Sequence, residues 1–183
     1  MTPRILLVGM MGAGKSTTGR LVATALGWRY CDSDADVEAD TGLTVPELFA
    51  RDGEDAFRRA EALVLARACD AALPSVVSVA GGAVLGAENR TRIKAAGTVV
   101  WLRARPETLA VRVGDGAGRP LLGDDPGEAM VRLSTVRAPF YEELADLVID
   151  VDALTPAEVA ERILAAVGAD MVIEAVAERD GED

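Results

Sequence analysis

The chain has 183 residues, a length that fits one domain with a sizeable hydrophobic core. Half of the residues are apolar but only 4% are aromatic, so Ala, Val and Leu must fill most of that core. The formal net charge of −11 argues against nucleic acid or an anionic membrane as the main partner, and no apolar run approaches the roughly 18 residues of a membrane span.

The N-terminal segment MTPRILLVG runs directly into a strand pattern, which leaves no room for a signal peptide. The chain has no histidine, and its two cysteines, Cys31 and Cys69, lack the spacing of metal ligands. Reduced thiols in a cytoplasmic protein are the simplest interpretation of these two residues.

Short β-branched runs alternate with helical patterns along the chain. Strands are predicted at residues 5–9, 29–32, 76–80, 98–102 and 147–151. Helices are predicted at residues 15–26, 34–40, 45–51, 54–72, 88–96, 106–113, 127–145 and 156–167. Continuous apolar strands separated by helices are typical of a parallel sheet covered on both faces, so we expect an α/β three-layer sandwich.

No internal repeat or low-complexity linker divides the chain, so a single domain over residues 1–167 is expected. The segment 113–127 is rich in Gly and Asp, which predicts a mobile loop. Residues 168–183 end in acidic residues and are predicted to form a flexible tail.

The first predicted strand leads into a phosphate-binding loop. Gly9, Gly14, Lys15 and Ser16 satisfy the pattern G-x-x-x-x-G-K-[ST], with a strand before it and a helix after it. The glycines let several backbone N–H groups face one anion, and the helix adds its positive N-terminal end. Lysine is rare in this arginine-rich chain, which strengthens the match. The nucleotide-binding residues expected here are Gly12, Ala13, Gly14, Lys15, Ser16 and Thr17.

The Mg²⁺ that accompanies a nucleotide usually needs a carboxylate as well as the Ser16 hydroxyl. The predicted strand 76–80 ends without an aspartate, but Asp32 and Asp34 follow the second strand. The carboxyl ends of parallel strands lie at one edge of the sheet, so both should lie beside the phosphate loop. We predict one Mg²⁺ per site, held by Ser16 and Asp32. Asp34 should face the same way if the strand continues; the alternative is that both aspartates merely cap the next helix.

The acceptor of the phosphate is indicated by polar groups elsewhere in the chain. A guanine-reading N-K-x-D segment is absent, which leaves a small-molecule kinase. Arg58 and Glu61 share one helix face, Gly81 and Gly82 follow the third strand, and Arg137 lies in a later helix. Two arginines in one pocket favour a carboxylate ligand, although each arginine alone is more often a surface residue.

Six segments, taken in this order, resemble the shikimate kinases, a family of small P-loop kinases similar to the nucleoside monophosphate kinases. They are GMMGAGKST, DSDADVE, FARDGEDAFRRAE, AGGAV, GRPLL and RAPFYEELAD, and the resemblance extends through about residue 167. It implies ATP-dependent phosphorylation of the 3-hydroxyl of shikimate to shikimate 3-phosphate, a step toward chorismate and the aromatic amino acids. It also implies a P-loop kinase fold with strand order 2-3-1-4-5, an acceptor-binding region at about 33–61 and a lid at about 113–125.

The resemblance also implies roles for single residues. Lys15, Asp34 and Arg119 would be catalytic, with Asp34 binding the shikimate hydroxyls as base and Arg119 reaching the transferred phosphate from the lid. Arg58 and Arg137 would hold the shikimate carboxylate. The remaining assignments are adenine contacts by Arg112 and Pro156, ring contacts by Gly81 and Gly82, apolar pocket walls at Phe49 and Phe57, and anchoring of Arg58 by Glu61.

Two departures from the family pattern affect these expectations. Ala80 stands where the family usually has the first of three glycines, which is harmless only if its backbone is strand-like. A basic residue often found near the adenine is replaced within DVDALTP, which makes the affinity for nucleotide uncertain. The alternatives are another small-molecule kinase such as a gluconate kinase, or a non-catalytic ATP-binding module. We expect a monomer whose partners are the small molecules shikimate and ATP, without nucleic acid or membrane.

Overall fold

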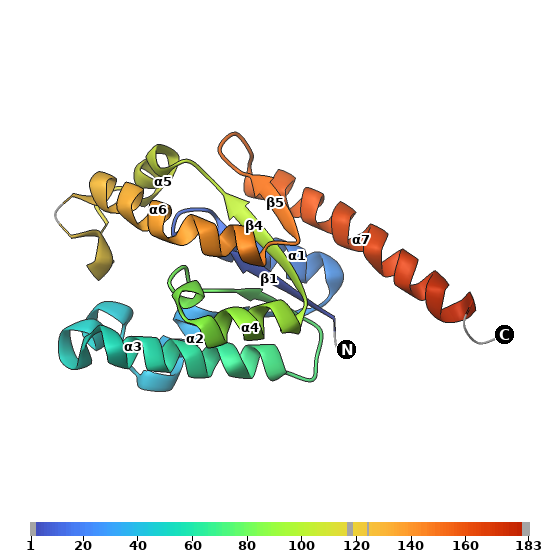
Figure 1. Ribbon diagram of the computed structural model, residues 1–183, viewed down its shortest axis with the longest axis horizontal. Helices are drawn as coiled ribbons and strands as arrows, with labels where there is room; N and C mark the ends of the chain where they lie inside the picture. Colours follow the sequence, from blue (N-terminus) through green and yellow to red (C-terminus); the bar gives the residue numbers. More distant parts are fainter. Residues whose placement is uncertain (1–2, 117–118, 124, 181–183) are drawn as a thin grey trace.

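The computed structural model describes residues 3–116, 119–123 and 125–180, with side chains through residue 168. Its strands are β1 (Arg4–Val8), β2 (Arg29–Asp32), β3 (Ser75–Ser78), β4 (Thr98–Arg103) and β5 (Leu147–Asp150) (Figure 1). Its helices are α1 (Lys15–Leu26), α2 (Ser33–Thr41), α3 (Val45–Asp70), α4 (Ala87–Ala96), α5 (Pro106–Val113), α6 (Pro126–Leu144) and α7 (Pro156–Asp180). Two short 3₁₀ turns are η1 (Ala83–Leu85) and η2 (Pro120–Leu122). No helix among the described residues is long and apolar enough to cross a membrane.

The five strands form one parallel sheet in the order β2-β3-β1-β4-β5, which confirms the predicted order and fold class. The central strand β1 is fully buried, with Leu6 paired to Val77 of β3 and Val99 of β4. A strand buried on both faces needs a continuous apolar run, which explains the sequence ILLV. The carboxyl ends of the strands therefore lie at one edge, where the functional side chains are expected.

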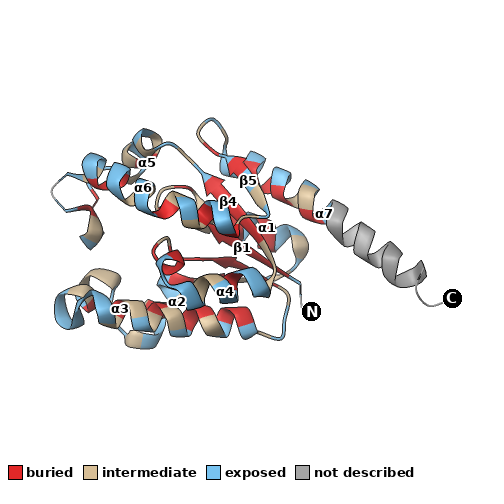
Figure 2. Ribbon diagram, viewed as in Figure 1, coloured by how far each residue is buried: buried red, intermediate tan, exposed pale blue. Residues whose placement is uncertain are grey.

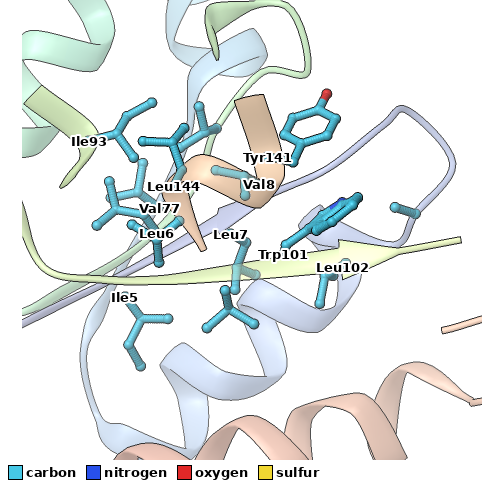
Figure 3. Close-up of a cluster of buried hydrophobic side chains, with 14 of the residues drawn as sticks. Ile5, Leu6, Leu7, Val8, Val77, Ile93, Trp101, Leu102, Tyr141 and Leu144 are labelled. Atoms are coloured by element: carbon cyan, nitrogen blue, oxygen red, sulfur yellow. The ribbon is translucent and has the colours of Figure 1, made fainter. Parts of the chain in front are cut away.

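Helices cover both faces of the sheet. In Figure 3, α4 with Ile93 and α6 with Tyr141 and Leu144 lie on one side of the strands, and α1 and α7 lie on the other side. Helix α3 packs against α4 and α2. Figure 2 shows the buried residues concentrated on the strands and on the inward faces of the helices.

A glycine interrupts α3 and reshapes it. Gly53 has φ 80° and ψ 174°, a conformation that is essentially restricted to glycine, so the two helices predicted at 45–51 and 54–72 form one element with a kink. Thr44 and Glu47 form a reciprocal capping box at the start of α3. The first part of α3 contacts α2, where the Val45 amide donates to the Glu38 carboxylate at 3.0 Å.

The predicted end of the last helix at residue 167 is wrong, because α7 continues to Asp180. Gly168 lies inside the helix and is followed by good helix formers such as Ala and Met. Residues 181–183 of the predicted flexible tail lie outside the described residues, as do 117, 118 and 124 of the predicted lid.

Candidate active site

A cavity of about 490 Å³ lies at the carboxyl edge of the sheet. It is enclosed by the phosphate loop, the ends of β2 and β3, helix α3, helix α6 and the segment around η2. Most of the predicted site residues line it: Gly12, Gly14, Lys15, Ser16, Thr17, Asp32, Asp34, Phe49, Phe57, Arg58, Glu61, Gly81, Gly82, Arg112, Arg119 and Arg137. Ala13 is buried beneath the loop, and Pro156 does not line the cavity.

The phosphate loop has the backbone that its glycines predict. Gly9, Gly12 and Gly14 all have positive φ, and a Cβ atom at Gly9 would lie only 2.6 Å from the carbonyl oxygen of Leu102. The Lys15 ammonium donates to the carbonyl oxygens of Gly9 at 2.8 Å and Met10 at 3.0 Å. Burial lowers the pKa of Lys15 to about 8, against the opposing charges of the nearby aspartates. An anion in the loop would remove this desolvation penalty.

The predicted metal ligands lie in contact with each other. The Ser16 hydroxyl donates to Asp32 Oδ2 at 2.7 Å, and Asp32 Oδ1 accepts a hydrogen bond from the Asp34 backbone at 3.3 Å. Asp32 therefore also caps the N-terminus of α2, as the alternative interpretation predicted. The same carboxylate caps the helix and contacts Ser16. Among the residues that the structure describes, no group of three or more His, Cys, Asp or Glu could cage a metal. One carboxylate and one hydroxyl fit Mg²⁺, which keeps waters and binds phosphate oxygens.

Asp34 reaches the cavity by a different route from the one expected. The chain turns into α2 at Ser33, so Asp34 lies in the first helical turn and is not extended. It still lines the cavity, with its side chain open to solvent there. Partial desolvation by the cavity walls raises the pKa of Asp34, and the charge of Lys15 opposes this rise.

Arg58 is held by two carboxylates of its own helix. Its guanidinium contacts Glu61 at 3.0 Å and Glu54 at 3.0 Å. Glu61 is only 1% exposed, and burial raises its pKa to about 7 although Arg58 lowers it. A Cβ atom at Gly82 would lie 2.2 Å from Arg58 Nη1, so the guanidinium lies directly against bare backbone. A side chain at this position would displace the Arg58 guanidinium from the backbone.

Arg137 is a buried cation for which the described residues supply no ion-pair partner. It is 2% exposed, and no ion pair to it occurs within the described parts of the chain. Its Nη1 would lie 3.4 Å from a Cβ atom at Gly81, whose carbonyl accepts a hydrogen bond from Tyr141 at 2.7 Å. Arg58 and Arg137 thus converge on the Gly81–Gly82 backbone from α3 and α6. An uncompensated buried charge is unfavourable, so this geometry favours an anionic ligand.

Two further arginines, Arg112 and Arg119, line the cavity. Arg112 of α5 donates to the carbonyl oxygens of Val151 at 2.8 Å and Asp152 at 3.4 Å. This contact joins α5 to the loop that leads to Pro156, although Pro156 itself stays outside the cavity lining. Arg119 is exposed and immediately precedes η2, so its position depends on the short segment around it.

The replacement of glycine by Ala80 is tolerated by the backbone. No described residue other than glycine has a positive φ, and Ala80 is buried in the turn that follows β3. Its carbonyl accepts a hydrogen bond from Ala83 at 3.0 Å, which closes the turn. The positive φ that alanine disfavours is therefore absent at Ala80.

Two functional neighbours were missed from the sequence. Tyr30 contacts Asp32 through its hydroxyl, and Tyr141 contacts the Gly81 carbonyl. A signal exists in both cases: Tyr30 lies two residues before Asp32, on the same strand face, and Tyr141 lies one helical turn after Arg137. Neither spacing shows which partner the hydroxyl meets on another element.

Comparison with known proteins agrees with this geometry. The shikimate kinase family model matches residues 11–168 of the chain. A shikimate kinase of Symbiobacterium thermophilum is 46% identical over 163 residues, which is 87% of this chain and 93% of that protein. The solved structure of shikimate kinase from Acinetobacter baumannii in complex with shikimate has a TM-score of 0.88 and 36% identity, covering 93% of this chain and 95% of that one. A gluconokinase from Sinorhizobium meliloti, covering 94% of this chain and 97% of that one, has a TM-score of 0.54 at 20% identity and shares the fold alone.

Proposed function

The chain belongs to the shikimate kinase family, and we propose that it transfers the terminal phosphoryl group of ATP to the 3-hydroxyl of shikimate. The observation that carries the acceptor is Arg137, a buried cation without a carboxylate partner among the described residues, which converges with Arg58 beside the Gly81–Gly82 backbone. Planar guanidinium groups bind a carboxylate through paired hydrogen bonds, and shikimate has one carboxylate. The phosphate loop lies in the same cavity, so both substrates meet there.

We propose the following roles around the acceptor. Arg58 and Arg137 hold the carboxylate, and Glu61 keeps the Arg58 fork in its orientation through their ion pair at 3.0 Å. Phe49 and Phe57, with ring centroids 4.8 Å apart, form an apolar wall beside the sugar-like ring. The backbone at Gly81 and Gly82 contacts ring hydroxyls, and the lack of side chains allows this close approach. These residues come from the expected acceptor-binding region and from two more distant segments.

We propose that one Mg²⁺ binds with the nucleotide at Ser16 and Asp32. When bound, the ion neutralises phosphate charge and aligns the phosphates. The Ser16 hydroxyl and the Asp32 carboxylate already lie 2.7 Å apart. Both side chains could therefore bind one ion, for which Ser16 would give up its hydrogen bond to Asp32. The nucleotide lies on the backbone of Gly12, Ala13, Gly14 and Thr17, with its adenine between Arg112 and Pro156.

Transfer then depends on charge and position more than on a strong base. Lys15 leaves the Gly9 and Met10 carbonyls and pairs with the phosphates, whose negative charge opposes the effect of burial that lowers its pKa. Asp34 orients the 3-hydroxyl and accepts its proton late in the transfer. Arg119 approaches the transferred phosphate when the segment 113–125 closes as a lid, and closure excludes water that would otherwise hydrolyse ATP.

The direct test measures ADP release with ATP and Mg²⁺, first without an acceptor, then with shikimate, then with gluconate. We expect ADP release to depend on shikimate and to remain at background with gluconate, because only shikimate offers a carboxylate together with a ring hydroxyl in this geometry. Equal rates with gluconate would support the sugar-kinase alternative. ADP release that is independent of any acceptor would indicate an ATPase.

We also propose that the protein acts as a monomer in the cytoplasm, without nucleic acid or membrane partners. The whole site is built from one chain, and the two cysteines are free and buried, as in a reducing compartment. Sedimentation at assay concentrations tests the monomer.

A further inference from the structure

The hydroxyl of Tyr30 connects the sheet to the candidate metal ligand. It lies 2.7 Å from Asp32 Oδ2 and 2.9 Å from Ser78 Oγ. Asp32 and Ser78 are paired across β2 and β3, so the tyrosine spans two residues whose separation is set by the sheet. Ser78 is itself 2% exposed, and its carbonyl accepts a hydrogen bond from Ser33 at 3.1 Å.

The direction of these hydrogen bonds follows from the chemistry of the groups. An ionised carboxylate can only accept, so the single proton of Tyr30 is donated to Asp32. Ser78 must then donate its own proton to Tyr30. The result is a directed chain from Ser78 through Tyr30 to Asp32, in which each bond polarises the next. A phenolic hydroxyl carries one proton and can also accept, so Tyr30 can occupy the middle of this chain.

The ring of Tyr30 is seated separately from its hydroxyl. A Cβ atom at Gly19 would lie 2.7 Å from the ring, so this glycine of α1 makes the space that the ring occupies. The guanidinium of Arg20 lies over the ring at 5.1 Å from its centre. Removing the hydroxyl alone should therefore leave the ring and the local packing in place.

Asp32 is held from three sides by these contacts. Oδ2 accepts from Ser16 and Tyr30, and Oδ1 accepts from the backbone of Asp34. When Ser16 turns to a metal ion, as the proposed function requires, the bond from Tyr30 remains on the same carboxylate oxygen. A carboxylate whose rotation is restricted loses less entropy on binding a metal than a free one does.

We propose that Tyr30 is a positioning residue that orients Asp32 for the metal of the metal–ATP complex, and that Ser78 orients Tyr30 in turn. This inference rests on the proposed metal role of Asp32. It predicts that the hydroxyl of Tyr30 affects metal binding in the ternary complex and leaves the binding of metal-free nucleotide unchanged.

The test compares Tyr30→Phe with the unaltered protein, using Mn²⁺ as the probe. Electron paramagnetic resonance measures Mn²⁺ binding to the enzyme–ATP complex, and calorimetry measures ATP binding in the presence of EDTA. Partners of metal ligands typically change metal affinity about 10- to 100-fold, so Tyr30→Phe should weaken Mn²⁺ binding by about tenfold or more. ATP affinity in EDTA and the melting temperature should change little. Ser78→Ala should give a smaller loss of the same kind.

Asp32→Asn separates this inference from the function on which it rests. If Asp32→Asn abolishes the metal dependence while Tyr30→Phe and Ser78→Ala leave Mn²⁺ binding unchanged, the metal role stands and the positioning role is overturned. If Asp32→Asn leaves Mn²⁺ binding unchanged, the proposed metal site itself fails. Should Tyr30→Phe not fold, Ser78→Ala alone decides, because it removes the donor to Tyr30 and keeps the tyrosine. Equal weakening of ATP binding with and without metal would also contradict the positioning role.

Discussion

At the scale of single residues, the proposed acceptor site contains two guanidinium groups that differ in their partners. Arg58 has two carboxylates of its own helix, whereas no ion pair forms on buried Arg137 in the described parts of the chain. The two carboxylates fix the orientation of the Arg58 guanidinium. The buried charge of Arg137 is left for a ligand to balance. A single carboxylate placed between them would satisfy both residues.

Arg58→Lys tests the fork directly. A lysine keeps the charge but has no planar pair of donors, so the KM for shikimate should rise about 10- to 100-fold while kcat changes less. The neighbouring Arg59 is exposed on the same helix, and Arg59→Lys is the matched control. Steady-state kinetics at saturating ATP measures both variants. An unchanged KM together with a lowered melting temperature would make Arg58 a packing residue.

Glu61 should make stability depend on pH. Its pKa is raised to about 7 in the folded protein by burial, so between pH 4.5 and 7 the folded protein retains a proton that the unfolded chain has released. The contribution of this group to stability therefore falls as pH rises through that window, by up to about 3 kcal/mol. Urea unfolding at pH 5 and pH 8 should show this fall in the unaltered protein and a smaller one in Glu61→Gln. Glu54→Gln removes the exposed partner of Arg58 and serves as the control. If the free energy of unfolding changed equally between pH 5 and pH 8 in all three proteins, Glu61 would not be the source of the pH dependence.

At the scale of elements, two irregular segments shape the cavity. Helix α3 is kinked at Gly53, between Phe49 and Phe57, and η2 carries the residues that follow Arg119. Both features depend on local backbone geometry within otherwise regular structure. Changes there should affect catalysis without altering the sheet.

Gly53→Ala should strain the kink. The φ of 80° with ψ of 174° is nearly inaccessible to alanine, at a cost of about 1–3 kcal/mol. A shift of the Phe49 ring away from Phe57 should also raise the KM for shikimate. Gly168→Ala, at a helical glycine with open space around it, should instead be neutral or slightly stabilising. Chemical denaturation gives the stability of both variants, and steady-state kinetics gives their KM for shikimate. If the two variants were equally stable, the conformation of Gly53 would not constrain the choice of residue.

Arg119→Ala tests the lid. An arginine that meets the transferred phosphate only in the closed state should affect kcat, by about 10³-fold or more, and leave shikimate binding nearly intact. Arg132 is an exposed arginine on α6, the helix that follows this segment, and Arg132→Ala is the matched control. Turnover measured at saturating substrates checks this. A normal kcat for Arg119→Ala would exclude Arg119 from the mechanism.

At the scale of the whole molecule, the sheet and its covering helices form a platform that supports the cavity at the carboxyl edge of the sheet. In the described part of α7, the buried residues are Val159, Ala160, Ile163 and Val167, and α7 packs against α1 on the face opposite α6. The last of these lies just before Gly168. The shikimate kinase family model also ends at residue 168, so we expect the part of the chain beyond it to be unnecessary for the platform.

Removing residues 169–183 should leave kcat, both KM values and the melting temperature nearly unchanged. Ile163→Ala, within the packed part of the same helix, should in contrast lower stability by about 2–5 kcal/mol because it opens a cavity against the sheet. Thermal unfolding and a kinetic assay compare the two. A large loss of activity on truncation would assign a role to the tail.

Much of this architecture could be predicted because it depends on residues close together in the sequence. The apolar run of β1, the glycines of the phosphate loop and Lys15 at the start of α1 lie within a few positions of each other, so spacing alone indicates their geometry. The strand order and the roles of Asp34 and Arg119 came from the family resemblance, which adds information that no local pattern contains.

Other features needed the folded chain, because they join residues far apart in the sequence. The approach of Arg58 and Arg137 to Gly81–Gly82 depends on how α3 and α6 pack over the sheet, and the contact of Tyr30 with Ser78 depends on the register of β2 with β3. A side-chain period shows which face a residue occupies, but it carries no information about the partner opposite. Packing and register set that partner, and with it the balance of charge in the candidate site.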